Sequence, residues 1–212
     1  MKRSLFFSGF FLFICLVAPA VAQSTSPLTA DERKKAVDYL ELTRKKFLDS
    51  IKGLSEDQWK FKPAADRWSV AEVAEHIGVS EQTIFGMITG QVMKSVADPS
   101  KRDGVKGKED QILKMIPDRT TRAQAPEILR PTGRWATREA LTEEFKKSRA
   151  ASIEFVKSTK EPLRDHFGPN PVFTELDAWQ WLLFMAAHTE RHTAQINEVK
   201  ADPAFPKKKS AY

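Results

Sequence analysis

Four stretches of the chain place apolar residues three or four positions apart, the spacing of one face of an α-helix. The stretches cover residues 29–52, 70–95, 137–161 and 174–200. Thr29 with Glu32 and Ser69 with Glu72 have the spacing of capping boxes, which satisfy free backbone amides at a helix start. No stretch has the alternation of a half-buried strand. The pattern therefore predicts an all-α protein with four long helices.

Residues 97–136 lack this periodicity and contain repeated proline and glycine. We expect a long crossover there, with one short helix near residues 109–116. Four helices with a long crossover between the second and the third indicate a four-helix bundle. A crossover of this length either shapes the mouth of a site or wraps the surface.

The N-terminus has the features of a secretory signal peptide. Lys2 and Arg3 precede an apolar run over residues 5–17, and small residues end at Ala22. We predict cleavage of residues 1–22, a mature chain that begins at Gln23, and a periplasmic or secreted protein. The alternative is an uncleaved anchor, but the run is shorter than the roughly 20 residues of a membrane span. No stable membrane span is then expected after cleavage.

The remaining boundaries and the charge follow from this prediction. Residues 23–202 form the bundle domain, and the basic residues 203–212 form a disordered tail. Signal removal lowers the net charge from +6 to +4, with 32 basic and 28 acidic residues, too weak and scattered for nucleic acid. The single cysteine, Cys15, lies in the signal, so the mature chain has no disulfide and no thiolate.

Histidine is the residue type that suggests chemistry in this chain. His188 and His192 are four positions apart, on one face of the fourth helix. His76 lies on the inward side of the second helix, whereas His166 lies among glycine and prolines and is expected in a turn. We predict that His76, His188 and His192 hold one metal ion; the alternative is that all are ordinary polar residues of the bundle.

The positions of three other polar residues relative to these histidines predict where their side chains point. Gln195 shares the face of His188 and His192, so it is expected to bond a ligand ring or contact a bound molecule. Glu72 lies on the same helix face as His76 and could orient that ring or act as a base, although its capping role already explains its presence. Glu190 is expected to point away into solvent. Three imidazoles leave a coordination position open, which fits zinc best, with nickel, iron or manganese as alternatives.

Two motifs resemble the DinB-like superfamily, also called DinB/YfiT or bacillithiol-transferase-like. Residues 68–77 are similar to its W-S-x-x-E-x-x-x-H pattern, and residues 188–196 to its H-x-x-R-H-x-x-Q-I ending. The resemblance implies an up-down-down-up four-helix bundle with a divalent metal on His76, His188 and His192. Members of this superfamily with a known activity include metal-dependent thiol S-transferases and a mycothiol-dependent isomerase, and many members form dimers. The resemblance therefore implies a possible transferase activity and a possible homodimer.

The sequence thus predicts an exported, metal-dependent hydrolase or transferase that acts on a small molecule. The alternative is a non-catalytic bundle that binds a metal or another ligand. A third interpretation is a metal-free structural bundle.

Overall fold

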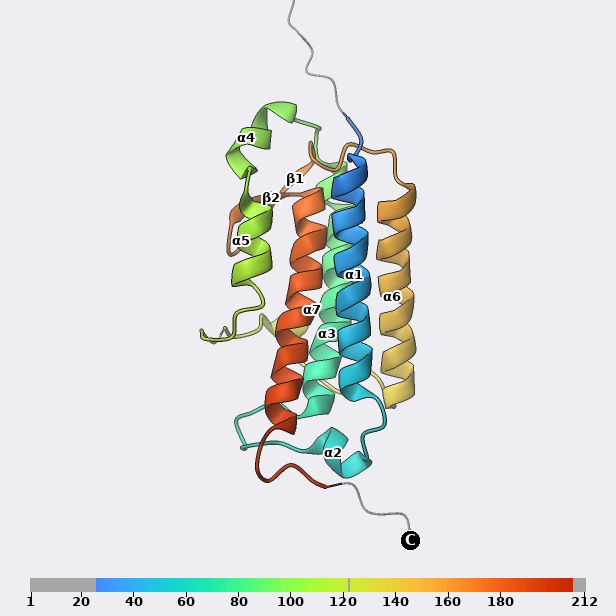
Figure 1. The fold of residues 1–212 in the computed structure, drawn as a ribbon, viewed down its shortest axis with the longest axis vertical. Coiled ribbons are helices and arrows are strands. Elements are labelled where there is room, and N and C mark those ends of the chain that lie inside the picture. The colour runs from blue at the N-terminus through green and yellow to red at the C-terminus, as the bar shows by residue number, and fades with distance from the viewer. Residues whose placement is uncertain (1–25, 122, 208–212) are drawn as a thin grey trace, which may run out of the picture.

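Four long helices lie side by side in the computed structural model, which describes residues 26–121 and 123–207 (Figure 1). They are α1 (Ala30–Ile51), α3 (Val70–Gly90), α6 (Arg138–Ser158) and α7 (Ala178–Lys200). The predicted four-helix bundle is confirmed. None of the described helices is long and apolar enough to span a membrane. The predicted signal peptide lies outside the described residues.

The bundle has two helices in each direction. In Figure 1, α1 and α7 run downward, whereas α3 and α6 run upward. Both α1 and α3 contact both α6 and α7. Because α3 and α6 are parallel, the chain between them must return along the length of the bundle. This return is the long crossover that the sequence predicts.

The crossover contains more regular structure than the proline and glycine pattern predicts. The short helix predicted near residues 109–116 is α5, which packs against α7. The segments of the crossover are a 3-10 turn at Val92–Lys94, a second at Pro99–Lys101, α4 (Arg102–Val105), α5 (Lys108–Met115) and a third 3-10 turn at Glu127–Leu129.

Several boundaries differ from the prediction. The second long helix ends at Gly90 rather than near residue 95. A five-residue helix, α2 (Glu56–Lys60), lies in the connector before α3. A short antiparallel hairpin of β1 (Phe167–Asn170) and β2 (Thr174–Asp177) precedes α7. Thr174 therefore belongs to a strand.

The N-cap of α7 is Asp177, which forms a capping box with Gln180. The predicted tail also starts too early at residue 203. The ring of Phe205 packs edge-on against Phe61, with ring centroids 5.4 Å apart, and the Gln58 amide donates to the Pro206 carbonyl at 2.8 Å. Residues 208–212 lie outside the described part of the chain.

A polar layer crosses the core between two apolar clusters. Its centre is a bidentate pair in which Arg149 Nε and Nη2 donate to the Glu81 carboxylate at 2.6 and 2.7 Å. Both side chains have 0% exposure. The remaining guanidinium hydrogens reach the Leu40 carbonyl, the Thr43 hydroxyl and the Thr189 hydroxyl. The layer thus links all four long helices.

Candidate metal centre

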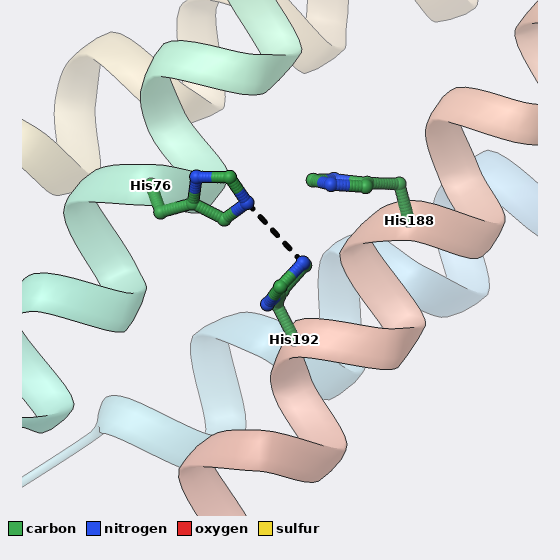
Figure 2. Close-up of side chains that lie close together, drawn as sticks. All are labelled: His76, His188 and His192. Carbon is green, nitrogen blue, oxygen red and sulfur yellow. Dashed lines mark hydrogen bonds between the residues drawn. The ribbon is translucent and has the colours of Figure 1, made fainter. Parts of the chain in front are cut away.

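The rings of His76, His188 and His192 meet between α3 and α7 (Figure 2). Their centroids are 5.0 Å apart for His76 and His188, 4.3 Å for His76 and His192, and 4.4 Å for His188 and His192. One ring nitrogen from each lies within 4.8 Å of the other two. Antiparallel packing of α3 and α7 produces this meeting, because it sets His76 opposite one turn of α7.

Hydrogen bonds donated by Nδ1 determine which ring nitrogens face the centre. The Nδ1 of His76 lies 2.7 Å from the Leu129 carbonyl oxygen, so it must carry the hydrogen and donate it. The Nδ1 of His192 donates in the same way to Gln195 Oε1, at 2.8 Å. Arg119 Nη1 also donates to this oxygen, which supports that orientation of the Gln195 amide.

These bonds leave two lone pairs facing each other. With Nδ1 protonated in both neutral rings, Nε2 of His76 and Nε2 of His192 are bare acceptors 3.2 Å apart. Two acceptors at this distance repel unless a proton or a cation lies between them. A shared proton would place a positive charge on a buried imidazole, which burial disfavours. A metal cation removes the conflict.

The surroundings keep all three imidazoles neutral. Burial lowers the pKa of His76, and its bond to the Leu129 carbonyl opposes this only in part. Burial, with the nearby His76 and Arg191, lowers the pKa of His188 to about 3. Burial and the neighbouring histidines also hold the pKa of His192 well below its usual value. Neutral imidazole is the form that binds a metal ion.

The donor set fits a tetrahedral metal. Zinc binds histidine nitrogen at about 2.0–2.1 Å, so two nitrogens on one tetrahedral ion lie roughly 3.3 Å apart. The observed 3.2 Å between Nε2 of His76 and Nε2 of His192 matches that spacing. A nitrogen of His188 lies within 4.8 Å of both. Three nitrogens suit zinc, while nickel and iron share the same ligand preference.

The other expectations have mixed outcomes. Gln195 bonds His192, as its position on the helix face predicts. Glu72 completes the capping box with Ser69 and pairs with Lys62 at 2.9 Å, so its side chain serves the helix start. The expectation for Glu190 is wrong.

Glu190 accepts from the Tyr39 hydroxyl at 2.6 Å and pairs with Lys46, with only 24% of its side chain exposed. The reason is that α1 packs against α7, so that Tyr39 and Lys46 of α1 reach Glu190. His166, expected in a turn, directly follows the turn at residues 163–165 and is buried, and its Nδ1 donates to the Ser95 carbonyl at 2.9 Å. It is not part of the described three-histidine cluster.

The crossover supplies parts of the site that the sequence does not reveal. Leu129 acts through its backbone carbonyl, which carries no side-chain signal. Arg191 donates to the carbonyls of Ile116, Asp118 and Thr121, and so ties the crossover to α7 beside the histidines. The crossover therefore forms one wall of the site.

Comparison with known proteins gives three matches. A family model described as the DinB superfamily matches residues 39–196. The uncharacterized protein YuaE of Bacillus subtilis (strain 168) is 30% identical over 152 residues, which cover 72% of this chain and 89% of YuaE.

The third match is a solved structure of YfiT from Bacillus subtilis. It aligns with 82% of this chain and 88% of its own, at 14% identity and a TM-score of 0.45. That protein is described as a probable metal-dependent hydrolase with an unusual four-helix bundle topology.

Proposed function

The chain belongs to the DinB superfamily, and we propose that it is a zinc-dependent enzyme, a hydrolase or group transferase for a small molecule. The observation that carries the proposal is the pair of unprotonated Nε2 atoms of His76 and His192, held 3.2 Å apart. His188 adds a third nitrogen, and three ligands leave one position for a substrate or water, as in catalytic zinc sites.

The metal and the residues around it would have different roles at this site. When bound, a divalent metal polarises a substrate oxygen and lowers the pKa of a water or thiol. The Leu129 carbonyl fixes the ring of His76, and the Gln195 side-chain amide fixes the ring of His192. The Trp68 ring packs beside His76, with ring centroids 5.1 Å apart.

The metal is tested first, with protein purified without a nickel column. We expect close to one equivalent of divalent metal by elemental analysis. His188→Ala should lose most of it, whereas His166→Asn should keep it, because His166 lies outside the cluster and asparagine can still donate to Ser95. Equal metal content in wild type and His188→Ala would refute the three-histidine site.

Turnover is tested with ester and amide substrates and with thiol transfer to an electrophile. We expect activity that chelation abolishes, zinc restores and His188→Ala lacks. Hydrolysis without added thiol identifies a hydrolase, and a strict thiol requirement identifies a transferase. Full metal content without any turnover on these panels would favour a non-catalytic metal-binding bundle.

A further inference from the structure

The residue before the first histidine, Glu75, gathers three backbone amides of the crossover. Its Oε1 accepts from the amides of Thr132 at 2.7 Å and Arg134 at 3.0 Å, and its Oε2 accepts from the amide of Gly133 at 3.0 Å. Glu75 is 7% exposed, whereas residues 132–134 are exposed. The carboxylate is thus the anchor of this loop.

The same segment touches α3 at two further points within one helical turn. The Leu129 carbonyl accepts from Nδ1 of His76. The ring of Trp135 lies on Gly78 so closely that a Cβ there would be 3.0 Å from Trp135 Cη2. We call residues 127–135 the clasp.

Apart from one 3-10 turn at Glu127–Leu129, the clasp has no regular structure of its own. Its position therefore depends on contacts with α3. Hydrogen bonds to an ionised acceptor are about twice as strong as those between neutral groups. Glu75 supplies three such bonds, and they lie only three to five residues from Leu129. Without them, the Leu129 carbonyl would be free to move off the His76 ring.

We propose that Glu75 is a positioning residue of the metal centre. By anchoring the clasp it holds the Leu129 carbonyl against Nδ1 of His76, and this fixes the tautomer whose Nε2 lone pair faces the other histidines. The effect on metal binding rests on the function proposed above, whereas the effect on the tautomer does not.

The first test is the zinc affinity of Glu75→Gln, measured by competition with a chromophoric chelator. Glutamine keeps one acceptor oxygen but presents its NH₂ to a backbone amide. Loss of such outer partners typically weakens metal binding about 10–100-fold, and we expect a loss in that range. Wild-type affinity in Glu75→Gln would overturn the proposal.

Asp177→Asn is the matched control for general destabilisation. Asp177 is also a buried carboxylate that accepts a backbone amide, that of Gln180 at 2.7 Å. It precedes His188 by eleven residues, roughly 16 Å along α7. We expect zinc affinity within about twofold of wild type, even if its melting temperature falls as far as that of Glu75→Gln. Equal weakening in both variants would mean that Glu75 acts on stability alone and would overturn the proposal.

Gly78→Ala disturbs the clasp without touching a hydrogen bond. Alanine has a higher helix propensity than glycine, so we expect the fold to be retained while the added Cβ, 3.0 Å from Trp135 Cη2, pushes that ring away from α3. We expect weaker zinc binding, although less so than in Glu75→Gln. This variant decides the question if Glu75→Gln does not fold; unchanged affinity would then count against the clasp.

Long-range ¹H–¹⁵N correlation spectra of the metal-free protein test the tautomer directly. His76 should show protonated Nδ1 in wild type and Asp177→Asn, and a mixture of tautomers in Glu75→Gln. Should wild type bind no zinc, the proposed function fails, but these spectra still decide whether Glu75 fixes the ring. An unchanged Nδ1–H tautomer in Glu75→Gln would overturn the proposal.

Discussion

Glu81→Gln is expected to be among the most destabilising isosteric changes in this protein. The substitution removes one negative charge and leaves the shape of the side chain unchanged, so no cavity forms. It leaves the guanidinium of Arg149, at 0% exposure, without its counter-charge. It also turns an NH₂ group toward a donor that now bonds a carboxylate oxygen at 2.7 Å.

The magnitude follows from the burial of the pair. Removing one partner of a buried ion pair costs about 3–5 kcal/mol. The total stability of a domain is about 5–15 kcal/mol, so the loss is a large fraction of it. At about 2–4 °C per kcal/mol for a domain of this size, the melting temperature should fall by roughly 6–20 °C.

Urea unfolding followed by tryptophan fluorescence measures this, with chelator present so that metal binding does not contribute. Glu41→Gln is the control, because the Glu41–Arg44 pair is exposed and such pairs contribute at most about 1 kcal/mol. A cost below about 1 kcal/mol for Glu81→Gln, with an unchanged denaturant slope, would refute the reasoning.

A double variant tests the same reasoning from the opposite direction. Glu81→Leu with Arg149→Met removes both charges, and such apolar replacements are often neutral or stabilising. The Thr43 and Thr189 hydroxyls would keep the bonds that they already donate to carbonyls of their own helices. Stability within about 2 kcal/mol of wild type is therefore expected.

Three further predictions concern pH, an unpaired hydroxyl and the N-terminus. Because the folded-state pKa values of the three clustered histidines lie below 6.5, the unfolded chain takes up protons that the folded protein does not, and unfolding of the metal-free protein should require less urea as the pH falls below about 6.5. Asp177, whose pKa burial raises to about 6, opposes this by one proton between about pH 6 and 4. A urea midpoint that stays unchanged as the pH falls from about 6.5 to 6, before Asp177 contributes, would contradict the prediction. The hydroxyl of Ser80 is buried and has no hydrogen-bond partner among the described residues, so Ser80→Ala should raise stability by about 1 kcal/mol in thermal melts, and a loss would show that the hydroxyl is in use. Sequencing of the protein from an exporting host should begin at Gln23, and retention of Met1 would refute signal cleavage.

The long helices and the clustered histidines were predictable because their signals are local. Apolar spacing and capping boxes act within a few residues, and the structure places both predicted boxes at helix starts. His188, His192 and Gln195 share one helix face, so geometry along a single helix relates them. To include His76 in the cluster, only one further assumption was needed: that the inward face of the second long helix meets that of the fourth.

The hairpin and the ordered crossover were not predictable, because distant groups hold them in place. Each strand has only four residues, and Pro169 and the positive φ of Thr174, 66°, obscure any alternation. Arg191 of α7 donates to backbone carbonyls of the crossover, and Glu75 of α3 accepts from its backbone amides. These bonds involve only the backbone of the crossover, so they do not depend on its side chains. The sequence of the crossover therefore does not reveal them.

Residues 73–81 of α3 explain why a single inward face was an incomplete description of this helix. All nine are buried, so this stretch has no solvent side. At about 100° per residue, Glu75, His76 and Glu81 project in three directions, and they meet the clasp, α7 and Arg149 of α6 respectively. A buried charge persists only with a partner, so each polar residue in this run implies a specific contact. Charged residues inside an otherwise apolar helix are therefore the sequence signal for the clasp and the ion pair, although they do not identify the partner.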